Sequence, residues 1–284
     1  MKINIGDVDL WFDVEGSSLV PDGPVMRERP TVLMLHGGPG FDHSHLKPYY
    51  SRLAEFAQVI FFDQRGTGRS DLSSPDKWNL DQWADDVDAF CRKLGIEKPV
   101  VTGVSAGGFV ALAYAVRYPD GPGKVMVSGT AANMRLDRML PVFERLGGAE
   151  ARAVAEAFWT QADDESRLAP YLETCFPLYY RTPQDPDWLE RATVNAEMLS
   201  HFFKPDGEGF RFDLLPGLAS VKCPVLVLAG EHDPVLPAAQ SDDIAAALPG
   251  DLVRYEYFPE CGHTPERDDP ETVFGMMREF ILGE

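Results

Sequence analysis

The sequence is poor in cysteine and in basic residues, and each shortage excludes a class of protein. Its four cysteines are scattered without CxxC spacing, so neither a disulfide framework nor a zinc site is expected, and we predict reduced, packed thiols. With 26 basic against 45 acidic residues, the formal net charge is -19. Such a surface repels phosphate backbones and anionic membranes, so we expect neither nucleic acid nor a membrane as partner.

Long apolar runs are also missing. No stretch approaches the roughly 18 apolar residues of a membrane span, and the start MKINIGDVDL lacks the basic and apolar regions of a secretory signal. We therefore predict a cytoplasmic protein. At 284 residues the chain is long enough for one large α/β domain with an inserted subdomain.

Short apolar runs alternate with helical patterns along most of the chain. Strand-like runs occur at 31–35, 59–62, 100–104, 125–127, 225–228 and 253–258. Helical patterns occur at 80–94, 109–117, 238–248 and 271–282. Alternation about Gly6 and Asp7 predicts a hairpin near 3–14, followed by a loop over 16–30. The order of elements predicts an α/β fold with a doubly wound, mostly parallel sheet.

The alternation stops between 131 and 217, where helical patterns at 149–161 and 188–203 occur without a convincing strand. We predict a helical cap at 131–217, inserted into a core of residues 1–130 and 218–284. Aromatic and methionine side chains of the cap could line an apolar pocket. The competing interpretation for each of them is that it only packs the cap onto the core. The candidates for substrate binding are Phe143, Trp159, Tyr180, Met198 and Phe202.

One serine stands where a predicted buried strand turns into a helix. The stretch GVSAG at 103–107 fits G-x-S-x-G, the nucleophile elbow, and has the strand-to-helix setting that this motif requires. Glycines two residues before and after the serine leave room for a strained turn. The following helix directs backbone N–H groups and a partial positive charge at an anion formed there. We therefore predict Ser105 as a nucleophile, with a merely tight turn as the alternative.

A serine nucleophile needs a base and an acid that orients the base. Asp233 follows the predicted strand at 225–228, and His263 follows the one at 253–258. The order Ser, Asp, His accompanies this elbow, and catalytic groups gather at the carboxyl ends of such strands. We predict Asp233 as acid, with Glu231 and Glu260 as rivals, and His263 as base. The other histidines lack metal-ligand spacing, so no metal is predicted.

The stretch HGGPG at 36–40 also follows a predicted strand, and because it has few side chains, backbone N–H groups can approach a substrate oxygen. We predict an oxyanion hole formed by the N–H groups of Gly38 and Ala106. A phosphate-binding loop is the rival, but neither G-x-x-x-x-G-K-[ST] nor G-x-G-x-x-G occurs. No cofactor is predicted.

Over nearly its whole length the chain resembles an α/β-hydrolase-fold serine hydrolase. The pairing of HGGPG with DQRGTGRS at 63–70 resembles the proline iminopeptidase branch, which implies that Asp63 and Arg65 support the turn beside the active site. Two positions depart from that branch. Ala106 stands where it has tryptophan, and Leu199 stands where it has a glutamate that meets the substrate's amino group. Glu197, two residues earlier, would point to another face of a helix.

These features predict a serine hydrolase that cleaves a small carboxylic ester or lactone through an acyl-enzyme intermediate. An aminopeptidase that releases N-terminal proline is the alternative, weakened because a buried α-amine needs a carboxylate partner. A carbon–carbon bond hydrolase and a catalytically silent binding protein are the remaining hypotheses.

Overall fold

An eight-stranded sheet forms the centre of the protein in the computed structural model, which describes residues 1–183 and 185–284. In spatial order its strands are β1 (Lys2–Asn4), β2 (Asp9–Glu15), β6 (Gln58–Phe62), β5 (Thr31–Leu35), β7 (Val100–Val104), β8 (Lys124–Ser128), β9 (Val225–Gly230) and β10 (Val253–Phe258). The pairs β1–β2 and β2–β6 are antiparallel, and all the others are parallel. The predicted doubly wound, mostly parallel α/β sheet is confirmed.

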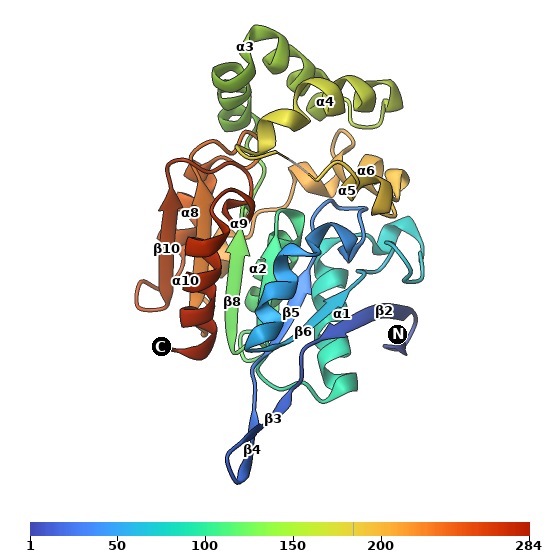
Figure 1. Cartoon of the computed structure of the whole chain (residues 1–284). Helices are drawn as coiled ribbons and strands as arrows, with labels where there is room; N and C mark the ends of the chain where they lie inside the picture. The colour runs from blue at the N-terminus through green and yellow to red at the C-terminus, as the bar shows by residue number, and fades with distance from the viewer. Residues whose placement is uncertain (184) are drawn as a thin grey trace.

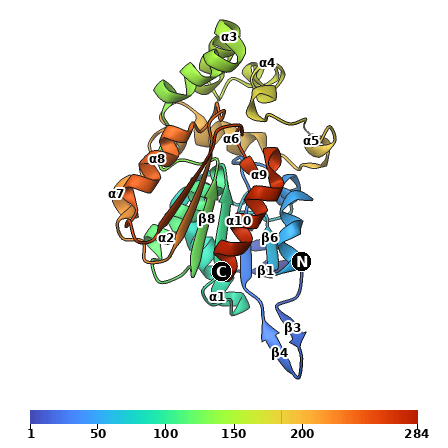
Figure 2. The ribbon, with the colours of Figure 1, turned by 60° about the vertical axis from the view of Figure 1, so that its left-hand side comes forward.

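Both faces of the sheet are covered, which explains why its central strands read as unbroken apolar runs. Along β5, Leu33 and Leu35 enter one hydrophobic cluster and Val32 and Met34 enter the other, since successive side chains alternate. The first cluster contains α1 (Leu80–Leu94), α2 (Ala106–Arg117) and α8 (Ala238–Ala247). The second contains α10 (Pro270–Leu282) and the 3-10 helix Tyr49–Glu55. In Figure 2, α2 and α10 lie on opposite sides of β8.

Two segments of the chain differ from the expectation. Residues 16–30, predicted as a loop, contain β3 (Leu19–Asp22) and β4 (Val25–Glu28), an antiparallel hairpin that projects from the sheet (Figure 1). The signal was Gly23, whose φ of 59° suits a tight turn between two short strands. The predicted helix at 188–203 is two helices, because Asn195 caps the second one by accepting a hydrogen bond from Met198 N–H at 3.2 Å.

Between β8 and β9, the described residues contain helices and no strand. They are α3 (Leu136–Thr160), α4 (Leu168–Thr174), α5 (Trp188–Arg191), α6 (Ala196–Phe203) and α7 (Leu215–Leu218). The helix α3 is kinked at Gly148, whose φ is 77°. In Figure 1, α3 to α6 lie above the end of the sheet at which the parallel strands terminate. This placement puts an aromatic-rich layer over the edge where site residues gather.

The remaining short elements are α9 (Pro265–Asp268) and the 3-10 helices His43–Leu46, Pro75–Lys77, Glu165–Arg167, Phe176–Tyr179 and Glu208–Phe210. All four cysteines are free and buried, and burial raises the pKa of Cys91, Cys175 and Cys261 to about 12. Among the described helices, none has the length and apolar character needed to cross a bilayer.

Candidate active site

Ser105 occupies a strained turn between β7 and α2. Its backbone has φ 55° and ψ -124°, a region that residues other than glycine seldom adopt. The turn is held from two sides, because Ser105 N–H donates to the Ser128 carbonyl at 3.0 Å and Thr130 Oγ1 donates to the Ser105 carbonyl at 2.8 Å. The serine is therefore fixed at the carboxyl end of a buried strand.

The two glycines of the elbow are required because a side chain at either position would clash with neighbouring backbone. A Cβ on Gly103 would lie 2.2 Å from the carbonyl oxygen of Gly107. A Cβ on Gly107 would lie 2.2 Å from the carbonyl oxygen of Leu35. Both clashes are with backbone, which cannot rotate away as a side chain can. The close approach of β7, β5 and α2 thus explains the spacing of G-x-S-x-G.

His263 and Asp233 form a buried pair after β10 and β9. His263 Nδ1 donates to Asp233 Oδ2 at 2.8 Å, and the two residues are 4% and 1% exposed. Asp233 Oδ1 accepts N–H groups from Val235 at 2.9 Å and Leu236 at 2.8 Å. With Nδ1 bonded to the carboxylate, Nε2 is the nitrogen left to act on a neighbour. His263 N–H donates to the Tyr179 carbonyl at 2.6 Å, which ties the histidine loop to the helical layer.

The rival acids are engaged elsewhere. The Glu231 carboxylate accepts from the Tyr257 hydroxyl and lies 3.8 Å from Arg145, and Glu260 is exposed. Neither residue is hydrogen-bonded to His263 within the described chain. Asp233 is thus the acid that the fold brings to His263.

The other histidines also have separate partners. His43 donates to Asp63 at 2.7 Å, and His232 Nδ1 lies 3.1 Å from Arg145. His36 Nε2 lies 3.1 Å from Thr67 Oγ1, and His201 contacts the Trp78 ring. His45 is the only one of these five that lines the same cavity as His263.

A cavity of about 160 Å³ lies over Ser105 and is lined by both Ser105 and His263. Most of its wall is apolar or aromatic, and no aspartate or glutamate belongs to the lining among the described residues. Leu199 lines the cavity, whereas Glu197 is exposed on another face of α6. A carboxylate suited to a substrate amine is therefore missing from this part of the wall.

The five predicted substrate-binding residues lie in different places. Trp159 and Tyr180 line the cavity. Phe143 is fully buried against the Tyr171 ring, with centroids 6.0 Å apart. Met198 and Phe202 line a second cavity of about 10 Å³, next to Ala106. These residues were selected as aromatic or methionine side chains of the cap, and residue type does not distinguish a side chain that packs on the core from one that borders a cavity.

Several lining residues escaped the sequence analysis. Tyr49 and Tyr50 come from an irregular 3-10 helix without a periodic pattern, and Arg267 lies four residues beyond His263. Val235 and Leu236 also line the cavity, and their position directly after Asp233 was an available signal. No local pattern marked the two tyrosines or the arginine.

The HGGPG turn borders the cavity with backbone atoms. Gly37 N–H donates to His45 Nε2 at 3.4 Å, and His45 Nδ1 donates to the Asp42 carbonyl at 2.8 Å. Burial, with His36 beside it, lowers the pKa of His45 to about 3, so this ring stays neutral. Gly38 lines the cavity, and within the described residues its N–H has no acceptor. Ala106 begins α2, where helix N–H groups lack partners in their own helix.

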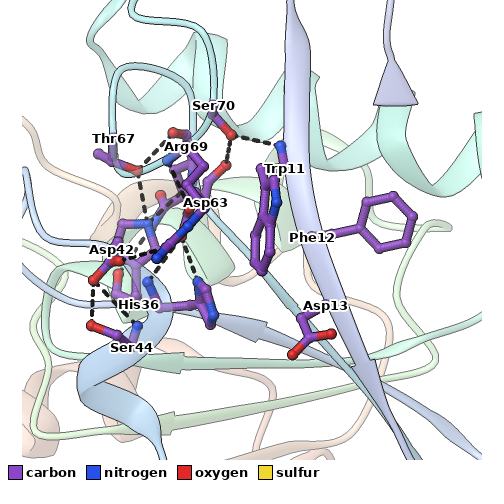
Figure 3. A network of polar contacts seen from close by, with 12 residues as sticks. Trp11, Phe12, Asp13, His36, Asp42, Ser44, Asp63, Thr67, Arg69 and Ser70 are labelled. Carbon is purple, nitrogen blue, oxygen red and sulfur yellow. Dashed lines mark hydrogen bonds and ion pairs between the residues drawn. The ribbon is translucent and has the colours of Figure 1, made fainter. Parts of the chain in front are cut away.

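The DQRGTGRS segment stabilises the structure beside this turn (Figure 3). Asp63 Oδ1 accepts from His43 N–H at 3.0 Å, and Asp63 Oδ2 accepts from Arg69 N–H at 2.9 Å. Burial would raise the pKa of Asp63, but the hydrogen bonds from His43 and the nearby imidazoles lower it. Arg65 forms ion pairs with Asp86 at 2.7 Å and Asp7 at 2.8 Å. Both residues hold segments distant in sequence together.

Three buried side chains in this network have metal-ligand chemistry. Ligand atoms of Asp42, His43 and Asp63 lie within 4.8 Å of one another. They already have partners, since Asp42 accepts from Ser44 and Arg69 while Asp63 holds His43. The Arg69 guanidinium supplies the positive charge there, and we assign these residues to the support of the turn.

The fold and site define a class of protein in which a strained serine and a buried histidine–carboxylate pair border one cavity at the carboxyl edge of a doubly wound sheet. Residues 30–265 match the model of the alpha/beta hydrolase fold family, and the chain belongs to that family.

Similar proteins place it near the predicted branch. RutD from Caulobacter sp. (strain K31), named as a carbamate hydrolase, is 29% identical and covers 98% of both chains. A proline iminopeptidase from Elizabethkingia meningoseptica is 26% identical over 88% of this chain and 89% of its own. The solved proline iminopeptidase of Mycobacterium smegmatis has a TM-score of 0.78 at 24% identity, over 100% and 97% of the two chains. The resemblance to the proline iminopeptidase branch is confirmed.

Proposed function

We propose that this protein is a serine hydrolase that cleaves a carboxylic ester or lactone. Ser105 Oγ attacks the carbonyl carbon while His263 Nε2 takes its proton and later gives that proton to the departing alcohol. Asp233 orients the imidazole and stabilises its charged form. The N–H groups of Gly38 and Ala106 hold the oxyanion. A water molecule, deprotonated by His263, then attacks the acyl-enzyme carbonyl and releases the acid.

The observation that carries this proposal is the single cavity lined by both Ser105 and His263, with Asp233 hydrogen-bonded behind the histidine. We expect a carbonyl group bound in this cavity to contact both the serine and the imidazole. The largely apolar wall suits an uncharged acyl or alcohol portion.

The polarity of the wall supports an ester or lactone over an N-terminal amine. A protonated α-amine is strongly hydrated, and burying it without a carboxylate is unfavourable. Among the described lining residues there is no carboxylate, and Arg267 adds a positive charge. An ester or lactone has no such requirement.

Aminopeptidase activity is the second candidate, favoured by one observation: HGGPG and DQRGTGRS occur together in this chain, as in relatives named proline iminopeptidase. The two candidates make opposite demands on a free amine. Proline 4-nitroanilide and its N-acetyl derivative separate them, because only an aminopeptidase should require the unblocked form. Turnover of the unblocked anilide far above that of esters would establish the second candidate.

The test is hydrolysis of 4-nitrophenyl esters of graded chain length and of simple lactones. We expect ester or lactone turnover that Ser105→Ala lowers about a millionfold, because the members of such a triad act as a unit. Labelling by a fluorophosphonate should likewise disappear. Ser220→Ala is the matched control, since this serine is exposed and, among the described residues, its hydroxyl bonds only to the Gly217 carbonyl. Turnover retained in Ser105→Ala, or none in the wild type, would contradict the proposal.

A further inference from the structure

Arg267 places a positive charge in the wall of the largely apolar cavity. It lies in α9, four residues after His263, and lines the same cavity as Ser105. Its Cζ atom is 4.9 Å from the centroid of the Tyr49 ring and 4.4 Å from that of Tyr180. The Tyr180 and His263 rings have centroids 6.5 Å apart, so the Tyr180 ring is a neighbour of both the arginine and the imidazole.

Among the described residues no ion pair joins Arg267 to a carboxylate, although the sequence has a large acidic excess. The charge of Arg267 contributes to the lowered pKa of Asp185, but the carboxylate of Asp185 is paired with Arg191. The adjacent carboxylates have other partners. Glu266 is buried and accepts from Ser128 Oγ at 2.8 Å. Asp268 accepts N–H groups from Gly262 at 2.7 Å and from Thr182 at 2.9 Å. These acids are positioned by the backbone and by Ser128 rather than by the guanidinium.

Most other arginines of this chain, by contrast, are paired with acids. Examples are the contacts of Arg65 with Asp86 at 2.7 Å and of Arg138 with Asp243 at 2.6 Å. An arginine held beside a cavity without an acid is therefore an exception in this protein. It gives the cavity wall a positive charge, whereas the net charge of the whole molecule is negative.

Stacking leaves the guanidinium able to bind a ligand. Aromatic rings attract it through their faces and do not neutralise its charge, and its hydrogen bond to the Tyr180 side chain leaves other N–H donors of the planar group for a ligand. The charge is felt within the cavity, where it adds to burial and His36 in lowering the pKa of His45. Burial raises the pKa of Tyr180, and Arg267 opposes that rise. In a wall with few polar groups, an anion would be attracted more strongly than at a water-exposed site.

We infer that Arg267 binds a carboxylate group of the substrate, so that the preferred ester or lactone combines an apolar portion with one negative charge. Planar guanidinium N–H groups match carboxylate oxygens in a paired arrangement. The inference rests on the proposed function at Ser105 and adds the class of substrate. Long-range repulsion by the acidic surface lowers the rate of arrival, whereas Arg267 acts on the bound substrate.

Matched esters provide the kinetic test. The 4-nitrophenyl monoester of adipic acid is compared with 4-nitrophenyl hexanoate, and 4-carboxyphenyl hexanoate with phenyl hexanoate, so the carboxylate lies on either side of the scissile bond. In the wild type we expect kcat/KM to favour the charged member of at least one pair. In Arg267→Gln that ratio should fall about 10- to 100-fold, the loss typical of a charge-assisted hydrogen bond. Arg267→Lys should retain part of the preference.

Arg211→Gln is the matched control, because this exposed arginine lies outside the cavity and should leave the ratio unchanged. An unchanged ratio in Arg267→Gln would overturn the inference, as would a wild-type preference for the neutral ester in both pairs. Equal losses on charged and neutral esters would instead assign Arg267 to the support of Tyr49 and Tyr180, which also overturns it.

A binding measurement separates this inference from the proposed reaction. Calorimetric titration of Ser105→Ala with adipic acid monomethyl ester needs no turnover, and methyl hexanoate is the neutral reference. We expect tighter binding of the charged ester, lost on adding Arg267→Gln. Equal binding of both ligands would refute the carboxylate site even if esters are hydrolysed. Tight anion binding in a protein that hydrolyses no ester would refute only the proposed function.

Discussion

Replacing Asp233 by asparagine tests the hydrogen-bonded pair most directly, because the local geometry dictates how the new side chain must orient. One carboxylate oxygen of Asp233 accepts N–H groups from Val235 at 2.9 Å and Leu236 at 2.8 Å. An amide NH₂ cannot replace an acceptor there, so the asparagine oxygen must take this position. Its NH₂ then faces His263 Nδ1, where the carboxylate now accepts at 2.8 Å.

The consequence is a change of tautomer in the imidazole. Nδ1 becomes an acceptor and Nε2 carries the proton, so Nε2 cannot take the proton of Ser105. A comparable change in a well-studied serine protease lowers kcat about 10⁴-fold. That factor corresponds to about 5 kcal/mol of transition-state free energy. Stability should change little, since both N–H groups of the turn keep their acceptor.

The assay is kcat for the best 4-nitrophenyl ester, together with the thermal unfolding midpoint of Asp233→Asn. Asp164→Asn is the matched control, because Asp164 also accepts a backbone N–H, from Ser166 at 3.0 Å, but lies at the surface. We expect the control to retain full activity. A folded Asp233→Asn with kcat within tenfold of the wild type would refute the reasoning about the tautomer and the assignment of the acid.

Two further predictions concern the surroundings of the site. A Cβ on Gly129, whose φ is 50°, would lie 1.8 Å from the His263 carbonyl oxygen, so Gly129→Ala should displace the histidine loop and lower kcat by at least tenfold. Gly275→Ala is the control, because a Cβ at this exposed position of α10 meets nothing within 4 Å; it should leave kcat unchanged and raise the unfolding free energy by about 0.5–1 kcal/mol. Urea unfolding and ester kinetics measure both variants. Equal kcat values in Gly129→Ala and Gly275→Ala would contradict the predicted clash. Burial lowers the pKa of His45 from 6.5 to about 3, so the unfolded chain takes up a proton below pH 6.5 that the folded protein excludes. This contribution to stability is complete above pH 6.5 and is lost as the pH falls to about 3, by up to about 1.4 kcal/mol per pH unit. The unfolding free energy of His45→Gln should therefore fall less steeply than that of the wild type between pH 7 and pH 5. If urea unfolding gives both proteins the same dependence of unfolding free energy on pH, His45 does not contribute in this way.

Local patterns in the sequence were sufficient for most of the fold. The runs at 31–35 and 100–104 coincide with β5 and β7, because a strand buried on both faces must be apolar throughout. The run at 253–258 coincides with the edge strand β10, which is only partly buried and also contains Arg254 and Glu256. The helix α1 begins after Asn79 and ends before Gly95, whose φ is 65°. These capping positions are readable before any tertiary contact is known.

Local sequence patterns predicted helix boundaries less well where contacts with distant parts of the chain determine them. The break between α5 and α6 depends on Asn195, whose N–H donates to the Gly40 carbonyl at 2.7 Å and whose side chain donates to the Gly66 carbonyl at 2.8 Å. Both partners lie more than a hundred residues away in the chain. Propensity within one window contains no information about them.

The sequence by itself determined the mostly parallel sheet, the strained turn at Ser105 and the residues that could serve as acid and base, because each depends on side-chain periodicity or on the conformational freedom of glycine. Only the tertiary structure decided that Asp233 rather than Glu231 or Glu260 bonds to His263. It also decided which aromatic residues border the cavity, and that Arg267 stands there without a carboxylate. These outcomes depend on how segments far apart in the chain approach one another, and that geometry is set by packing of the whole molecule.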